Sequence, residues 1–271
     1  MANLETISLI VAIVVLSLSL ILAIWKILRV RKSGSAEAAN RPVTVLTIAG
    51  LCLITLGIIS RTIITGHGPF SNMYEFSIAF SWGTVAMGLF FQWRYRTSIM
   101  STIGNVIALC LLIFAQTLPS RVLPLVPALQ QSFLLTSHVT AAVIAYGTFT
   151  IGFGASILFL LQQHNKFSWS PNPENLDDIS YTTVKIGFPF LTLLIVLGAL
   201  WADIAWGKYW SWDPKETASL VTWLIYAGYL HARVIRGWNG KKAAVLLITG
   251  FAAVLFTFFG NYIFVGLHSY G

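Results

Sequence analysis

Eight apolar segments of about 20 residues or more follow one another along this chain. A helix needs about 20 mostly apolar residues to cross a bilayer, because it rises only about 1.5 Å per residue. The segments cover 7–28, 43–65, 74–91, 99–118, 133–162, 186–204, 217–235 and 243–264. Only 10 % of the residues are charged, whereas a soluble domain has about a quarter. The sequence therefore predicts an all-α integral membrane protein, a bundle of about eight transmembrane helices.

The polar stretches between these segments are short, and the sequence shows no soluble domain or internal repeat. The longest is 163–185, where Ser170-Pro171-Asn172-Pro173 supplies turn residues. The first segment is too long for a signal peptide and lacks its small-residue cleavage site, so we expect it to be retained. We therefore treat 1–271 as a single polytopic membrane domain, with N-terminal helices in 1–130 and a core in 131–271.

The two cysteines, Cys52 and Cys110, each lie in the middle of an apolar segment and form no C-x-x-C pair. Free cysteine packs as a small hydrophobic residue, so both side chains are predicted to be buried. The absence of a reactive pair argues against a carrier of thiol–disulfide exchange.

Basic residues are distributed unevenly between the two sides of the predicted bundle. If the 29–42 loop is cytoplasmic, 13 of the 17 lysines and arginines fall on the cytoplasmic side. They are Lys26, Arg29, Arg31, Lys32, Arg41, Arg94, Arg96, Lys166, Lys185, Arg233, Arg236, Lys241 and Lys242. Cytoplasmic loops carry such an excess, so both termini are predicted to be extracytoplasmic. The net charge of +8 thus indicates membrane orientation rather than nucleic-acid binding.

The sequence WGKYWSWDPKE, residues 206–216, gathers aromatic rings in one short loop on the predicted extracytoplasmic side. The rings belong to Trp206, Tyr209, Trp210 and Trp212. Interfacial tryptophans anchor helix ends with one or two rings each, which explains the isolated tryptophans elsewhere in the chain but not this cluster. A loop with this many flat rings is typical of a surface that contacts a flat ligand.

The end of this loop has the pattern of a helix start. Asp213, Pro214 and Glu216 fit the N-cap, N1 and N3 positions, and Asp-x-x-Glu resembles a capping box. Both acids would then start the seventh helix, which does not exclude a second role. The positive end of the helix dipole also favours carboxylates of a ligand nearby.

Two histidines are predicted to reach the same membrane face as the loop. His138 lies at the outer start of the fifth segment, and His268 lies just past the outer end of the eighth. An imidazole on each axial side, with aromatic rings beside it, suits a planar metal macrocycle such as haem. The alternative for each is an interfacial histidine hydrogen-bonded to a carbonyl or to water.

His231 lies inside the seventh segment, toward the predicted cytoplasmic side. An ionisable residue in a spanning helix is a functional candidate, although a neutral histidine bonded between helices is the alternative. As a metal ligand, it would need a different ligand type or a partner protein opposite it, because no second intramembrane histidine is predicted. We expect His164 to be structural, and the sequence leaves His67 undecided.

The aromatic loop resembles the tryptophan-rich "WWD" signature of haem-handling membrane proteins of cytochrome c maturation. The resemblance is greatest to the CcsA type, called ResC in some bacteria, whose relatives include CcmC and CcmF. It covers the chain from His138 to the terminal GLHSYG, and PFSNMYE at 69–75 adds weaker support. It implies that haem b is presented extracytoplasmically by loop 205–216, within a haem-handling core at 131–271.

The resemblance also implies roles for individual residues. His138 and His268 would ligate the haem iron, and His231 would take part in haem entry opposite a histidine of a CcsB (ResB) partner. Trp206, Tyr209, Trp210, Trp212 and Asp213 would contact the haem or support the loop. Together the two proteins would attach haem to the C-x-x-C-H motif of apocytochrome c, with thiols from the substrate and no catalytic nucleophile in this chain. No CcsB-like domain is found here, so we do not expect the fused form.

Other functions remain open at this point. A haem transporter or chaperone that passes haem to a separate synthase would carry a similar loop. An electron-transfer subunit with permanent haem usually has paired histidines inside its helices, and a solute transporter with an aromatic lid would bind no haem. The membrane is predicted to be a bacterial cytoplasmic membrane or a thylakoid membrane, with the loop on the extracytoplasmic or lumenal side. Outer cations such as Lys208, Lys215 and Arg121 suit either haem propionates or lipid phosphates.

Overall fold

The computed structural model describes residues 2–33, 41–68, 70–122, 129, 132–162 and 167–263. Over these residues the chain forms eight α-helices and no strand, which confirms the predicted all-α class. The helices are α1 (Ala2–Ser33), α2 (Arg41–Thr65), α3 (Met73–Tyr95), α4 (Ile99–Gln116), α5 (Ser132–Leu161), α6 (Pro173–Trp206), α7 (Pro214–Val234) and α8 (Gly240–Ile263). Among the described residues, six helices are long and apolar enough to cross a membrane, all but α3 and α7.

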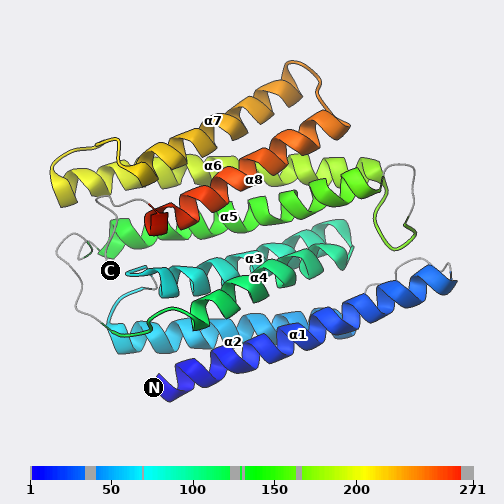
Figure 1. Ribbon diagram of the computed structural model, residues 1–271, viewed down its shortest axis with the longest axis horizontal. Helices are drawn as coiled ribbons and strands as arrows, with labels where there is room; N and C mark the ends of the chain where they lie inside the picture. The colour runs from blue at the N-terminus through cyan, green and yellow to red at the C-terminus, as the bar shows by residue number, and fades with distance from the viewer. Residues whose placement is uncertain are drawn as a thin grey trace.

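Successive helices run in opposite directions along one bundle (Figure 1). The start of α1 and the end of α8 therefore lie at the same end, as does the turn from α6 to α7. We call this the loop end, after residues 207–213. We call the other the basic end, after Arg94, Arg96, Arg233 and Arg236. All four follow or close helices that run away from the loop end.

Helix α3 joins two groups of helices. On one side, Leu9, Leu16, Ile54 and Leu112 form a core between α1, α2, α3 and α4. On the other side, a larger core built on rings such as Phe149 connects α3 with α5, α6, α7 and α8.

The two groups meet where α3 crosses α5. A Cβ atom on Gly147 would come within 2.6 Å of the Gly83 carbonyl oxygen. Small residues allow such close backbone contact between membrane helices, where van der Waals packing drives association. The glycines thus fix the position of α5, which carries His138.

Helix α6 begins earlier than the sequence indicates. The hydropathy pattern places residues 173–185 in a polar break, but they form the first three turns of α6. Leu176 and Ile179 are fully buried on one face of these turns, while Asp177 forms an ion pair with Arg233 at 2.7 Å. The segment is an amphipathic extension that low hydropathy hides. The predicted turn residues are confirmed at its start, where Asn172 caps the helix and Pro173 opens it.

The cysteines also differ from expectation. Cys52 and Cys110 are both exposed on the outside of the bundle instead of buried within it. A side chain in the middle of an apolar segment is away from water whether it faces protein or lipid, so the sequence could not distinguish the two. Both thiols face the side of the bundle that lipid would cover.

A buried ion network fastens α1, α2 and α3 at the loop end. Arg61 donates from Nε to Glu75 at 2.9 Å and lies 3.7 Å from Glu5, and all three side chains are almost completely buried. Arg61 also donates to the Ser120 carbonyl at 2.8 Å, and Tyr74 donates to Glu5 at 2.8 Å. Buried charges need such complete pairing, so the network holds one arrangement of these helix ends.

Candidate functional site

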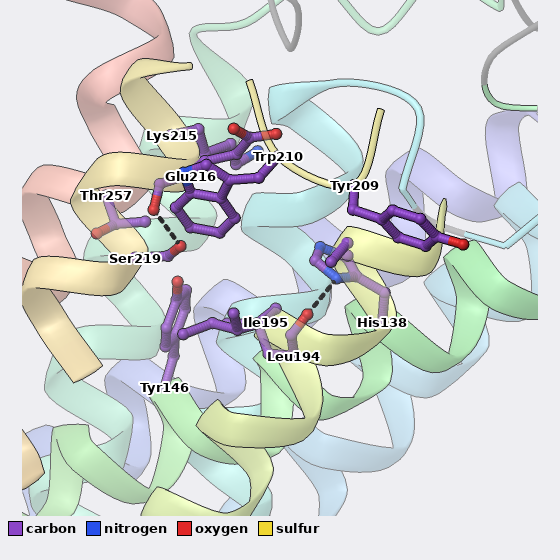
Figure 2. A pocket seen from close by; sticks show the side chains of 12 residues that line it. His138, Tyr146, Leu194, Ile195, Tyr209, Trp210, Lys215, Glu216, Ser219 and Thr257 are labelled. Carbon is purple, nitrogen blue, oxygen red and sulfur yellow. Dashed lines mark hydrogen bonds between the residues drawn. The ribbon is translucent and has the colours of Figure 1, made fainter. Parts of the chain in front are cut away.

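A pocket opens at the loop end between α5, α6, α7, α8 and the aromatic loop. His138 and Tyr146 of α5 face it, Trp210 of the loop covers it, and Tyr209 lies at its edge with the ring pointing outward (Figure 2). Its remaining polar lining comes from Lys215, Glu216, Ser219 and Thr257. The chain thus brings His138 and two of the predicted loop residues to one place.

His138 is held in one orientation by the backbone of α6. Its Nδ1 lies 2.8 Å from the carbonyl oxygen of Leu194, which can only accept a hydrogen bond (Figure 2). Nδ1 therefore carries the proton, and in the neutral ring Nε2 carries the lone pair. Metal-binding histidines are commonly oriented in this way, with the second nitrogen bonded to a carbonyl or carboxylate.

Gly198 leaves the room that this histidine occupies. A Cβ atom at position 198 would lie 2.9 Å from Cε1 and 3.0 Å from Nδ1 of His138. The imidazole is thus packed directly on the α6 backbone, one turn beyond Leu194. Sequence reasoning missed Gly198, since nothing in the sequence pairs α5 with this turn of α6.

The predicted capping box at the start of α7 is confirmed. Asp213 Oδ1 accepts from the Lys215 N–H at 2.9 Å, and the Glu216 carboxylate accepts from the Asp213 N–H at 3.2 Å. Glu216 also accepts from the Ser211 N–H at 2.8 Å. Both acids are buried, at 6 % and 9 % exposure. Because Glu216 accepts from the N–H groups of Ser211 and Asp213, it holds the loop backbone on both sides of Trp212.

Trp212 has an unusual backbone and an exposed ring. Its φ of +60° lies in the left-handed region, which costs a residue with a side chain about 1–2 kcal/mol. The residue is 69 % exposed, and its indole meets that of Trp210 edge to face, with ring centroids 5.9 Å apart. Strained residues held by their surroundings occur most often at functional sites. The loop therefore presents Trp212 outward at a cost in backbone energy.

The other predicted loop rings take different positions. Trp206 meets Trp201 edge to face at 4.8 Å and packs with Leu135 of α5, beneath the loop rather than in the pocket. Tyr209 is 58 % exposed, and its hydrogen bond to Asp203 raises the pKa of its hydroxyl. The loop rings thus have three different positions: Trp206 is partly buried beneath the loop, Trp210 forms a wall of the pocket, and Tyr209 and Trp212 are exposed.

His231 lies far from this pocket. It is in the last turn of α7, about 25 Å along the axis from the start of the helix at Pro214. Its side chain is exposed on the outside of the bundle, as are Val221, Leu224 and Gly228. These four residues follow the three-and-four spacing of one helix face. The structure therefore separates His231 from the loop site.

Of the three remaining histidines, only His67 lies among the described residues. His268 and His164 lie outside the described residues. His67 is nearly buried, with Nδ1 2.7 Å from the Gly68 carbonyl and its ring 5.4 Å from that of Phe70. Phe70 packs on the cluster that contains Trp201 and Trp206, so His67 is linked to the end of α6 through Phe70.

The size of the pocket limits what fits inside it. The space open to the centre of a water molecule is about 50 Å³, which holds a few waters at about 10–15 Å³ each. The residue types that line the pocket suit haem. The oriented imidazole of His138 can bind the iron, the aromatic rings can contact the macrocycle, and Lys215 can pair with a propionate carboxylate. A macrocycle would meet His138 only at the mouth of this pocket or after the loop shifts.

Comparison with known proteins gives a consistent result. Residues 70–268 match the cytochrome c assembly protein family. The chain is 42 % identical to "Cytochrome c biogenesis protein CcsA" of Chlamydomonas reinhardtii, across 85 % of this chain and 68 % of that protein. It is 37 % identical to the protein of that name from Guillardia theta, across 83 % and 84 % of the two chains. Identity to the one from Prochlorococcus marinus subsp. pastoris is 39 %, across 84 % and 83 %.

Proposed function

The chain belongs to the cytochrome c assembly protein family, and we propose that it presents haem for attachment to apocytochrome c. The family predicted from the tryptophan-rich loop is thereby confirmed, and with it a role in cytochrome c biogenesis as an integral membrane protein. The matched range includes the pocket, the loop and both candidate axial histidines. The finer assignments below rest on the geometry of the loop end, on the outward face of α7 and on the charges of the basic end.

The observation that carries the proposal is His138, fixed in one tautomer beside the aromatic loop. Its Nε2 lone pair is the ligand that haem iron takes from a proximal histidine. Trp210 and Tyr209 supply rings for the macrocycle, Trp212 extends this surface outward, and Lys215 supplies a cation for a propionate. The cargo proposed for this site is haem b.

A second axial ligand is proposed to be His268, which lies outside the described residues but inside the family match. Asp213 and Glu216 take the role of holding the loop, which their hydrogen bonds support. Ligation by two neutral imidazoles would tune the redox state of the iron.

The attachment step takes its reactive groups from the substrates. Each thiol of the C-x-x-C-H motif adds across one haem vinyl group, forming one C–S bond and placing the thiol proton on the other vinyl carbon. No net electron transfer accompanies either addition. The contribution of this chain is to hold the reactants in position and to control the redox state of the iron.

A CcsB-type membrane protein is the proposed partner. His231 lies on an outward face at the basic end, where a histidine from a neighbouring helix could meet it. A polar side chain on a lipid-facing helix surface is costly unless another chain covers it. Haem entry is assigned to this face, in a complex of the two proteins.

The proposed orientation places the loop end outside the cell or in the thylakoid lumen. Arg94, Arg96, Arg233 and Arg236 gather at the opposite end, and cytoplasmic loops carry such an excess. Apocytochrome c would thus meet the loop after export. The chain is assigned to a bacterial cytoplasmic membrane or a thylakoid membrane.

Co-expression with a CcsB-type partner and an apocytochrome bearing C-x-x-C-H tests this function. Covalent haem in the apocytochrome is expected with the intact pair. It should fall at least tenfold with His138→Ala or His268→Ala, because one axial ligand is lost. Covalent attachment that is independent of His138 would contradict the proposal. Haem that leaves the complex only on a separate haem-binding protein would instead favour the transporter or chaperone function.

A further inference from the structure

A second pocket lies at the basic end, between α2, α3 and the turn into α4. Its volume is about 710 Å³. Thr44 and Ile48 of α2 line one side, and Leu89, Gln92 and Trp93 of α3 line the other. Arg94, Arg96 and Ser98 close it where α3 ends. The loop site does not involve any of these residues.

The floor of this pocket is fixed by hydrogen bonds between three helices. Gln92 donates from Nε2 to the Thr44 hydroxyl at 2.6 Å, and its Oε1 accepts from the Ser101 hydroxyl of α4. A side-chain amide bonded on both sides cannot rotate without losing a partner. The pocket is therefore a formed feature of the bundle.

The rim of the pocket carries two positive charges. Arg94 and Arg96 are both exposed, and the residues that line the pocket include no carboxylate. The ion pairs within the described part of the chain involve two other arginines, Arg61 and Arg233. The rim therefore attracts an anion.

The backbone conformation of Arg96 also supports a binding role for the rim. Its φ of +52° places it in the left-handed region, where glycine is favoured and a residue with a side chain costs about 1–2 kcal/mol. Glycine would close α3 here with less strain, so the arginine at this C-cap is held in a costly backbone conformation. Strained residues held by their surroundings occur most often at functional sites, which supports a binding role for its guanidinium.

The walls of the pocket are apolar and face outward. Trp93 is 74 % exposed and Ile48 is 47 % exposed, with Leu89 half-buried between α3 and α2. Exposed tryptophan at a helix end is typical of the membrane interface. The occupant therefore needs an anionic head at the rim and an apolar body along α2 and α3.

We propose that this pocket binds one anionic phospholipid, with its phosphate between Arg94 and Arg96 and an acyl chain against Ile48 and Leu89. Basic pockets between transmembrane helices are known sites for anionic headgroups. Such a lipid would brace the junction of α2, α3 and α4. The site is independent of haem, so the two proposals can fail separately.

Native mass spectrometry of the full chain in detergent tests the site, with phosphatidylglycerol and phosphatidylcholine of equal chain length as probes. The wild type should retain phosphatidylglycerol in preference. Arg94→Gln and Arg96→Gly should each weaken its binding about fivefold, and the pair about 25-fold. Arg96→Gly suits the positive φ, so loss of binding there cannot be attributed to misfolding.

The matched control is Arg236→Gln with Lys241→Gln, which removes two exposed charges from the same end but outside the pocket. It should change lipid retention less than twofold. Equal retention of the two lipids by the wild type, or an equal loss in the control, would overturn the proposal. Displacement by glycerol 3-phosphate as effectively as by the lipid would also overturn it, because the apolar walls would then contribute nothing.

Discussion

His138 and His231 lie at opposite ends of the bundle and have opposite surroundings. His138 is half-buried, bonded at 2.8 Å to the Leu194 carbonyl and packed on Gly198 beneath an aromatic loop. His231 is exposed on the outside of α7, on a face that includes Gly228, where an added Cβ atom would meet no other atom within 4 Å. The surroundings of His138 are formed entirely by this chain, whereas His231 lies on an open outer surface of α7.

This difference suggests a division of roles between the chain and the proposed CcsB-type partner. A histidine whose tautomer and packing are already set can bind haem iron without turning its ring. A histidine on an outward helix face gains a defined geometry only when another chain covers it. The loop end is therefore expected to act as the presentation site, and the face of α7 as the place where the partner completes a site.

The largest effect is expected from Glu216→Ala. Glu216 accepts hydrogen bonds from two backbone N–H groups, those of Ser211 and Asp213. Leaving such groups unpaired costs about 2 kcal/mol, which corresponds to roughly 30-fold faster hydrogen exchange at both amides. Exchange measured by mass spectrometry checks this.

The control for that change is Glu174→Ala, an exposed acid in the first turn of α6 at the basic end. Surface changes of this kind usually stay within about 0.5 kcal/mol. Equal exchange in the two variants would mean that the capping network does not hold the aromatic loop.

A smaller effect is expected from Gly198→Ala, with Gly228→Ala as its matched partner. The new methyl group at 198 would press on the His138 ring, and overpacking of this kind costs about 1–3 kcal/mol. Haem affinity at the loop end should fall about tenfold. At 228 the space is open, so alanine should be neutral or raise Tm through its better helix propensity.

Haem titration and thermal melts of both variants measure this contrast. If the two alanines behave alike, the tight packing of His138 has no bearing on haem binding. The proposed difference between the packed site around His138 and the open face around His231 would then be wrong.

The smallest effect on stability is expected from His231→Ala. An exposed side chain contributes little to folding, so the free energy of unfolding of the isolated chain should change by less than about 0.5 kcal/mol. With the CcsB-type partner present, haem loading of the loop end should nevertheless fall. Unchanged loading in the complex would remove His231 from the proposed entry route.

Several of these features could be predicted from the sequence because they depend on local chemistry. The capping box at Asp213 and Glu216 requires only the preferences of residues within one helical turn, and it is present as predicted. The helix count follows from segment length and hydropathy. The early start of α6 could not be found in that way, since its turns are held by Leu176 on one face and the Asp177–Arg233 pair on the other.

The details of the site depend on contacts between distant segments. The Leu194 carbonyl and Gly198 define the orientation of His138, yet both lie more than 50 positions further along the chain. Ser219 and Thr257 line the same pocket and carry no motif of their own. The sequence pointed to the histidine and the loop, whereas the packing of α5 on α6 determines how they face one another.

Visible spectroscopy of the dithionite-reduced complex tests the central claim most directly, which is that His138 ligates haem at the loop end. The chain is purified with its CcsB-type partner, as wild type and as His138→Ala, with and without added imidazole. We predict a six-coordinate haem spectrum that weakens in the variant and returns with imidazole, which fills the vacated ligand position. A spectrum that His138→Ala leaves unchanged would contradict the account and move the axial ligand elsewhere.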